Sequence, residues 1–153
     1  MKATIKRVAG KALLAKSDSN HWVPLDAGPK AGGTDAASSP SEMLLIAAGA
    51  CTAMDQLFII GKSRKELTRY EMELEGIRAE THPKIFREIH FRVVAEGEEV
   101  SADQFKRAME LSLTKYCTVS LSLDRSIRFF ASFTLNGEEQ EEWELPRDTS
   151  FFE

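Results

Sequence analysis

The sequence lacks the short motifs that mark several large enzyme classes. It contains no glycine-rich phosphate loop, no serine-centred nucleophile elbow and no HExxH zinc motif. Its three histidines, His21, His82 and His90, are scattered and show no ligand spacing, so we expect no metal and no cofactor. The net charge of −4, without a basic stripe, argues against nucleic acid as a partner.

Long hydrophobic runs are also missing. The longest one, from Met43 to Met54, stops at Asp55 and is too short to span a bilayer. Basic residues interrupt the first 16 positions, so the pattern does not predict a signal peptide. The chain has only two cysteines, Cys51 and Cys117, and without an export signal we expect reduced thiols in the cytoplasm.

The 153 residues suit a single domain, which we place at residues 1–137. Residues 138–153 carry seven acids and one base, a composition typical of a solvated, loosely attached tail. The tail nevertheless contains four large apolar side chains that would dock on the same chain or on a partner subunit: Trp143, Leu145, Phe151 and Phe152.

The N-terminal part predicts strands at residues 4–8, 11–16 and 21–26, the last an edge strand because of Pro24. A long loop, residues 27–39, is expected to be functional or disordered. Ser39 and Glu42 then form a capping box, with Pro40 at the first helical position, and start a helix that closes at Gly61. This helix is apolar nearly all round, so we expect it to be wrapped on most sides. Gly49 within it indicates close packing against another backbone.

The second half predicts an antiparallel hairpin from residues 70–80 and 85–95, with Gly76 as a possible bulge. Ser101 caps a helix over 102–116, and a short helical piece at 119–123 follows. Residues 127–135 form the last expected strand, which Asn136-Gly137 ends. This order predicts an α+β fold with two helices packed on or between antiparallel sheets.

The cysteines have two interpretations. Both could be inert packing thiols, because free cysteine is among the most buried residue types. Alternatively they react: Cys117 lies at a helix break near Lys115, which would favour a thiolate. The apolar neighbours of Cys51, and Asp55 one turn later, would raise the Cys51 pKa unless a cation compensates. Residue patterns alone leave both interpretations open.

Residues 39–52 (SPSEMLLIAAGACT) and 113–120 (LTKYCTVS) together resemble the osmotically inducible protein C / organic hydroperoxide resistance (OsmC/Ohr) family. The resemblance covers most of the chain. It implies an intertwined α+β homodimer, with sheets packed around a long central apolar helix and a second helix, and with active sites at the subunit interface.

On this resemblance, Cys51 attacks an organic hydroperoxide and becomes a sulfenic acid. Cys117 resolves it as a disulfide, and a dithiol reductant restores both thiols. Such a pairing traps the sulfenic acid before it over-oxidises. The apolar run around Cys51 favours a lipophilic hydroperoxide over hydrogen peroxide.

Glu42 matches the glutamate that the family places at the start of this helix, although the capping box alone also explains it. Nine residues of straight helix put Glu42 roughly 13–14 Å from Cys51 and on about the opposite face, so Glu42 would act across the dimer. The family also supplies an arginine from its N-terminal strands. Here Arg7 is the only arginine before the helix, and the alternative cations, which lack the bidentate fork, are Lys2, Lys6, Lys11 and Lys16.

Two other functions fit the same residues. One is a non-enzymatic dimer that binds a small apolar or sulfur-containing ligand, or that senses redox state. The other is a dimeric scaffold in which the cysteines only pack.

Overall fold

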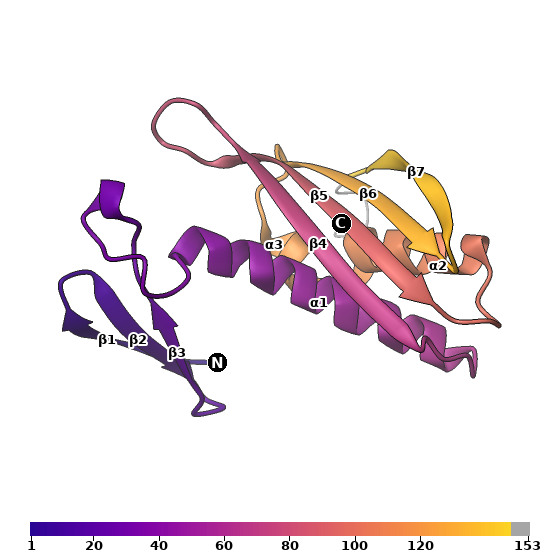
Figure 1. Ribbon diagram of the computed structural model, residues 1–153, viewed down its shortest axis with the longest axis horizontal. Helices are drawn as coiled ribbons and strands as arrows, with labels where there is room; N and C mark the ends of the chain where they lie inside the picture. Colours follow the sequence, from indigo (N-terminus) through magenta and orange to yellow (C-terminus); the bar gives the residue numbers. More distant parts are fainter. Residues whose placement is uncertain (148–153) are drawn as a thin grey trace. The chain divides into compact units, whose positions relative to one another are not determined.

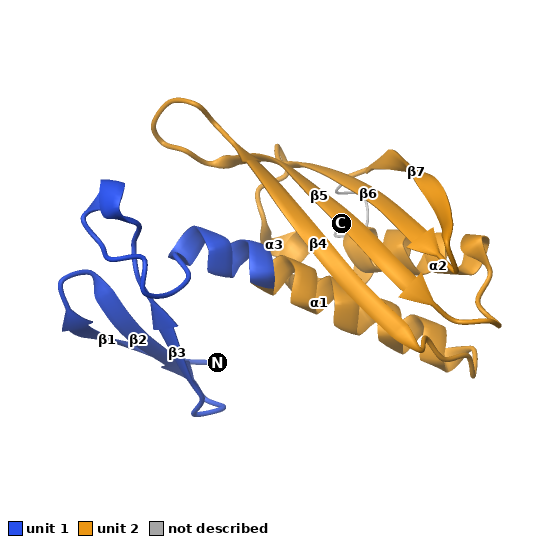
Figure 2. Ribbon diagram, in the orientation of Figure 1, with its two compact units in different colours: residues 1–46 blue, residues 47–153 orange. Residues whose placement is uncertain are grey.

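The structure is a computed structural model that describes residues 1–147. It contains two compact units, Met1–Ile46 and the part from Ala47 onwards, coloured separately in Figure 2. The mixed α+β fold predicted from the sequence is confirmed, with two sheets and a long helix (Figure 1). The assignment of residues 1–137 to a single domain stays a prediction.

The first unit carries a three-stranded antiparallel sheet in the order β1-β2-β3. Its strands are β1 (Ala3–Ala9), β2 (Ala12–Ser17) and β3 (Trp22–Leu25), close to the predicted ranges. β3, which contains Pro24, is an edge strand as predicted. Among the residues of this unit, all of which the structure describes, Asp26 is the single buried one. The unit therefore has no hydrophobic core of its own.

The long loop after β3 is ordered around the Asp26 carboxylate. Asp26 accepts hydrogen bonds from the hydroxyl of Thr34 at 2.6 Å and from the backbone N–H groups of Ala27, Thr34 and Ala36. The Thr34 hydroxyl, more than any other group, lowers the Asp26 pKa to about 2. Gly33 approaches Ala27 so closely that a Cβ atom would overlap its carbonyl group. The segment also includes a short 3₁₀ turn, η1 (Pro29–Ala31).

The long helix α1 (Pro40–Lys62) starts as predicted. The Ser39 N–H donates to the Glu42 carboxylate at 2.6 Å, and the Glu42 N–H donates to Ser39 Oγ at 3.4 Å, which completes the capping box. The predicted end at Gly61 is wrong. The helix continues to Lys62, and Arg64, rather than a glycine, takes the left-handed φ of 58° after it.

Only one stripe of α1 is buried within the chain: Ala48, Gly49, Thr52, Gln56 and Ile60. Met54 and Phe58 are 70% and 63% exposed, so the expectation that the helix is wrapped on most sides is wrong for a single chain. By length and composition alone, the 23 residues of α1 would also suit a membrane span, a test that core helices of soluble proteins pass as well. Gly49 does mark a close approach, but to the side chain of Leu74 rather than to a backbone.

The second sheet has the order β4-β5-β6-β7. β4 (Arg69–Arg78) and β5 (Phe86–Glu96) form the predicted antiparallel hairpin, with its irregularity at Ile77/Arg78 instead of Gly76. β6 (Arg128–Leu135) runs parallel to β5, so the prediction of antiparallel sheets is wrong for this pair of strands. The physical reason is the helical crossover between them, which returns the chain to the end of the sheet where β5 began.

That crossover contains α2 (Ala102–Leu111), a π-helical turn η2 (Ser112–Tyr116) and α3 (Thr118–Ser122). Ser101 caps α2 with a full capping box, as predicted for this residue. The buried Phe105 of α2 packs on Phe133 of β6 with ring centroids 4.9 Å apart. Since the cross-strand pairing puts Phe133 on the same face as Leu74, both α1 and α2 cover one face of this sheet.

Residues 138–145 do not belong to a loose tail. They form β7 (Glu138–Leu145), an antiparallel partner of β6. Asn136-Gly137 ends β6 as predicted and is also the turn of the β6–β7 hairpin. Leu145 is buried and Trp143 meets Phe133 edge-on, so these two side chains dock on the same chain. Phe151 and Phe152 lie outside the described residues. The acidic side chains suit a sheet edge, where charge discourages further pairing.

Candidate active site

The two cysteines lie side by side in the unit that begins at Ala47. The Sγ atoms of Cys51 and Cys117 and a carboxylate oxygen of Asp55 are all within 4.8 Å of one another. Both cysteines are free thiols; Cys117 is fully buried, whereas Cys51 and Asp55 are half-buried. The site therefore consists of the enclosed sulfur atom of Cys117 next to two groups that solvent can reach, the Cys51 sulfur and the Asp55 carboxylate.

The helix geometry explains how these residues meet. Cys51 and Asp55 are one turn apart on α1, which puts them on the same face. Cys117 lies in the bend between η2 and α3, the break predicted from the sequence, and its N–H donates to the Ser112 carbonyl at 2.8 Å. A π-helical turn inserts an extra residue into the helix and is frequent at functional sites. Here it directs Cys117 towards α1.

Hydroxyl groups surround the Cys117 sulfur. It accepts a hydrogen bond from the Thr52 hydroxyl at 3.4 Å and from the Ser120 N–H at 3.4 Å, so that the sulfur caps α3. The thiol itself donates to Ser120 Oγ at 3.1 Å. Thr52 and Ser120 are both fully buried. These bonds fix the direction of the sulfur, and the sequence patterns identified neither partner.

Asp55 is held by the start of the π-helical turn. The Ser112 hydroxyl lies 3.1 Å from the Asp55 carboxylate and 3.3 Å from the Thr52 carbonyl, and it can donate to either. Ser112 is fully buried, so its hydroxyl needs such a partner. This contact ties α1 to the segment that carries Cys117. Ser112 has no sequence signal of its own, because a lone serine at a helix end is common.

The surroundings of Cys51 oppose its ionisation. Burial, above all, raises the pKa of the Cys51 thiol, and the adjacent Cys117 and Asp55 raise it further. The N–H of Val119 acts in the opposite direction. No cation is among these principal influences within the described part of the chain. The predicted direction of the shift is therefore confirmed.

The structure places the other predicted site residues in the first unit. Glu42 serves the capping box, whose hydrogen bonds from Ser39 lower the Glu42 pKa. Arg7 donates to the Gly10 carbonyl at 2.9 Å, Lys11 contacts the Ala31 carbonyl, and Lys16 donates to Asn20 at 2.6 Å. Roles for Glu42 and for an N-terminal cation in catalysis stay predictions.

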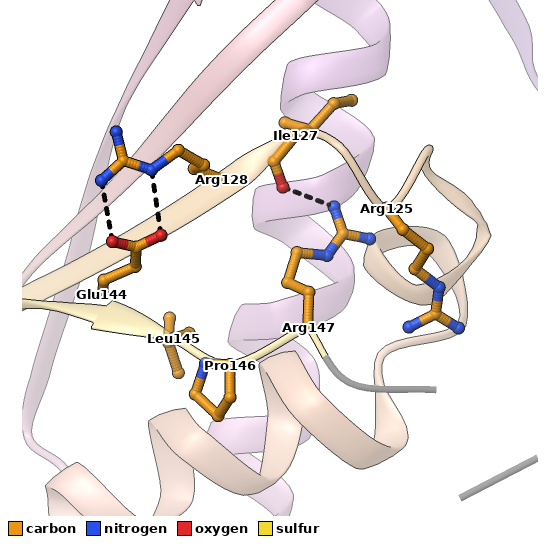
Figure 3. A pocket seen from close by; sticks show the side chains of 7 residues that line it. All are labelled: Arg125, Ile127, Arg128, Glu144, Leu145, Pro146 and Arg147. Carbon is orange, nitrogen blue, oxygen red and sulfur yellow. Dashed lines mark hydrogen bonds and ion pairs between the residues drawn. The ribbon is translucent and has the colours of Figure 1, made fainter. Parts of the chain in front are cut away.

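Arg147 stabilises the end of the helix that follows Cys117, and no sequence pattern predicted this role. Its guanidinium donates to the carbonyls of Ser120 and Leu123, at the end of α3, and to those of Asp124 and Ile127. Burial lowers the Arg147 pKa to about 10, which still leaves it charged near neutral pH. Arg147 and Ile127 line a cavity of about 360 Å³, whose lining also includes Arg128 paired with Glu144 (Figure 3). Arg147 therefore anchors the helix that Cys117 begins.

Comparison with known proteins supports the predicted resemblance. The family model for OsmC-like protein matches residues 33–130. Protein YhfA of Escherichia coli strain K12 is 34% identical over 133 residues, which cover 87% of this chain and 96% of YhfA. A crystal structure of a hypothetical protein from Aquifex aeolicus VF5 is 27% identical, covers 88% of this chain and 95% of that chain, and has a TM-score of 0.76.

A more distant structure shares the fold alone. It is an organic hydroperoxide resistance protein OsmC from Legionella pneumophila, 15% identical, with a TM-score of 0.63 over 87% of this chain and 96% of that chain. The family match includes both cysteines and most of the elements around them. The similarity to YhfA covers 87% of the chain. This chain belongs to the OsmC-like protein family.

Proposed function

We propose that the protein is a cysteine-based thiol peroxidase that reduces organic hydroperoxides. The observation that carries the proposal is the separation of the Cys51 and Cys117 sulfur atoms, at most 4.8 Å. A disulfide needs about 2.05 Å between sulfurs, so small side-chain rotations and a modest backbone adjustment close the bond. Thiols that only fill space in a core do not require an adjacent carboxylate or contact with solvent, whereas this pair has both.

The reaction runs in three steps. The Cys51 thiolate attacks the outer oxygen of the hydroperoxide, the O–O bond breaks, and the alkoxide leaves as an alcohol after taking a proton. The Cys117 thiolate then attacks the Cys51 sulfenic acid, forming the disulfide and displacing hydroxide, which takes up a proton to become water. A dithiol reduces this disulfide and is itself oxidised. Cys51 performs the first attack because it is the half-buried sulfur, while Cys117 is enclosed.

The raised pKa of Cys51 is the observation that favours the second candidate, a redox sensor or binding module. A thiol whose ionisation is opposed reacts slowly at neutral pH, because the thiolate is the nucleophile. In that function, oxidation would happen once and report a change of redox state, with turnover indistinguishable from background. The two candidates differ in rate, not in the chemistry of the sulfur pair.

We place this reaction in a cytoplasmic homodimer. The first unit exposes Ile5, Val8 and Trp22 and buries no apolar side chain, and such a small sheet is not stable without a covering surface. The exposed Met54 and Phe58 of α1 offer a second apolar surface. A partner subunit would cover both, and it is across this interface that Glu42 would assist Cys51. We expect Phe58→Glu to be monomeric in light scattering and the control Val94→Glu to stay dimeric. A dimeric Phe58→Glu would contradict this assembly.

The test of the peroxidase is consumption of tert-butyl hydroperoxide with dithiothreitol as reductant. We expect turnover by the wild type and none by Cys51→Ser. Without dithiothreitol, Cys117→Ser should consume one equivalent and then stop, with a sulfenic acid at Cys51 that dimedone traps. Thr118→Ser, an exposed neighbour of Cys117, serves as the matched control. Full activity of Cys51→Ser would end the proposal, and background turnover with intact thiols would favour the sensor.

A further inference from the structure

The ligand atoms around the two sulfurs form a set that metal chemistry recognises. Two cysteine sulfurs and one carboxylate oxygen converge within 4.8 Å, from side chains on α1 and from the bend before α3. The sequence argument against a metal considered only the histidines, and none of them belongs to this group. Cysteine sulfur and carboxylate oxygen are both common zinc ligands, and thiolates select thiophilic ions over magnesium or calcium.

The separations suit a single ion. With Zn–S bonds of about 2.3 Å, two sulfurs on one zinc ion lie at most about 4.6 Å apart, and roughly 3.8 Å apart at a tetrahedral angle. The upper limit of 4.8 Å in the structure is therefore closed by small side-chain rotations. Disulfide formation requires the same two sulfurs to approach much further. Metal binding thus needs the smaller rearrangement of the two.

From this geometry we propose that the reduced protein binds one thiophilic divalent cation, such as Zn²⁺, through Cys51, Cys117 and Asp55. The cation replaces the two thiol protons, which pass to the buffer, so the net charge of the three side chains plus their occupant does not change. Three protein ligands leave a fourth position, open on the side of the half-buried Cys51 and Asp55.

The hydrogen bonds around the group already orient the ligands. The Ser112 hydroxyl reaches the Asp55 carboxylate, and the Thr52 hydroxyl and Ser120 N–H both donate to the Cys117 sulfur. Donors of this kind hold metal ligands in place in established sites, where their loss typically costs 10–100-fold in affinity. Thr52, Ser112 and Ser120 are all fully buried. The ligand side chains are therefore already oriented in the metal-free protein.

Cation binding does not depend on the peroxidase reaction. Its effect on activity, however, rests on that proposed function. A sulfur engaged with zinc cannot attack a hydroperoxide freely, and two sulfurs held by one ion cannot form a disulfide. The cation would act as a reversible inhibitor that protects both thiols from oxidation. Removal of the ion by a chelator restores them.

The test is a Co²⁺ titration of the reduced, chelator-treated full-length protein without oxygen or hydroperoxide. We expect one equivalent per chain and an absorption band from charge transfer between thiolate and cobalt, which Zn²⁺ then displaces. Cys51→Ser and Cys117→Ser should lose this band. Asp55→Asn should bind at least about tenfold more weakly, because it loses a direct ligand. Glu98→Gln removes an exposed acid of equal charge and should bind like the wild type.

An undisturbed affinity in Asp55→Asn, or the lack of a cobalt–thiolate band in the wild type, would overturn the proposal. If a cysteine variant fails to fold, the wild type alone still decides: Zn²⁺ must slow alkylation of both cysteines, and a chelator must reverse this. Hydroperoxide consumption is measured separately in chelator-containing buffer. A protein that binds cobalt but consumes no hydroperoxide refutes the peroxidase and leaves the metal site standing.

Discussion

Replacing Arg147 by Gln removes the guanidinium that holds the end of α3, the helix that follows Cys117. The guanidinium reaches four backbone carbonyls at 2.9–3.1 Å, those of Ser120, Leu123, Asp124 and Ile127. It also stacks on Phe129, with its central carbon 3.9 Å from the ring centroid. A glutamine can donate to one or two of these carbonyls, and it carries no charge.

The expected cost follows from these contacts. A hydrogen bond to a charged group contributes about 1.5–3 kcal/mol, and leaving a buried carbonyl unpaired costs about as much. The four bonds share one cation and are not additive, and the bond to Asp124 is exposed, so water replaces it. The stacking on Phe129 adds about 0.5–2 kcal/mol. We therefore expect Arg147→Gln to lower the free energy of unfolding by about 2–4 kcal/mol.

Urea denaturation of the full chain measures this loss. The matched control is Arg107→Gln, because Arg107 is 67% exposed and its ion pair with Glu110 is 3.7 Å long. Such a surface pair contributes about 0–1 kcal/mol. Equal stabilities of the two variants would refute the reasoning that Arg147 is an anchor.

A second readout is local. If Arg147 holds α3 closed over Cys117, its loss should raise alkylation of Cys117 about tenfold or more in native buffer, since each 1.4 kcal/mol of opening energy is a factor of ten. Arg147→Lys keeps the charge but not the planar fork, so an intermediate rate is expected. Unchanged alkylation in Arg147→Gln would show that the bonds stabilise the chain without guarding the thiol.

Three further predictions concern pH and packing. Because the Cys51 pKa is raised, its alkylation in Cys117→Ser should keep increasing with pH beyond the usual thiol range, and Asp55→Asn should move this profile to lower pH; a shift to higher pH would contradict the sign. The folded Asp26 pKa of about 2 lies below its ordinary value of 3.8, so its stabilisation is complete above that value and is lost as pH falls towards 2. Protease cleavage within residues 27–38 should therefore increase over that window in the wild type, and a flat response would count against the Asp26-centred loop. Phe105→Ala should cost about 3–5 kcal/mol in denaturation, because Phe105 is fully buried, whereas Tyr116→Ala, half exposed, should cost far less; similar losses would count against this core.

Local sequence patterns predicted much of the fold. The capping boxes at Ser39 and Ser101 set the starts of α1 and α2, because they satisfy backbone groups within four residues. The alternation in β4 and β5 predicted their hairpin for a similar reason, since strand periodicity is a property of neighbouring positions. The resemblance of two segments to a family supplied the pairing of Cys51 with Cys117, which residue patterns alone left undecided.

The errors have different causes. β7 was taken for a tail because its acidic side chains face solvent, and only its pairing with β6 makes it a strand. The parallel register of β5 and β6 depends on the crossover between them. The end of α1 passed Gly61 because a glycine permits a left-handed turn without requiring one.

The sequence by itself determined which residues bear chemistry: a single pair of cysteines, with Asp55 one helical turn after the first. Tertiary structure alone decided that these three side chains converge, that Ser112 and Thr52 orient them, and that Arg147 anchors the helix behind them. Hydrogen bonds and packing between segments about 60 residues apart have no local signature, because any polar residue can fill such a position until the fold brings its partner close.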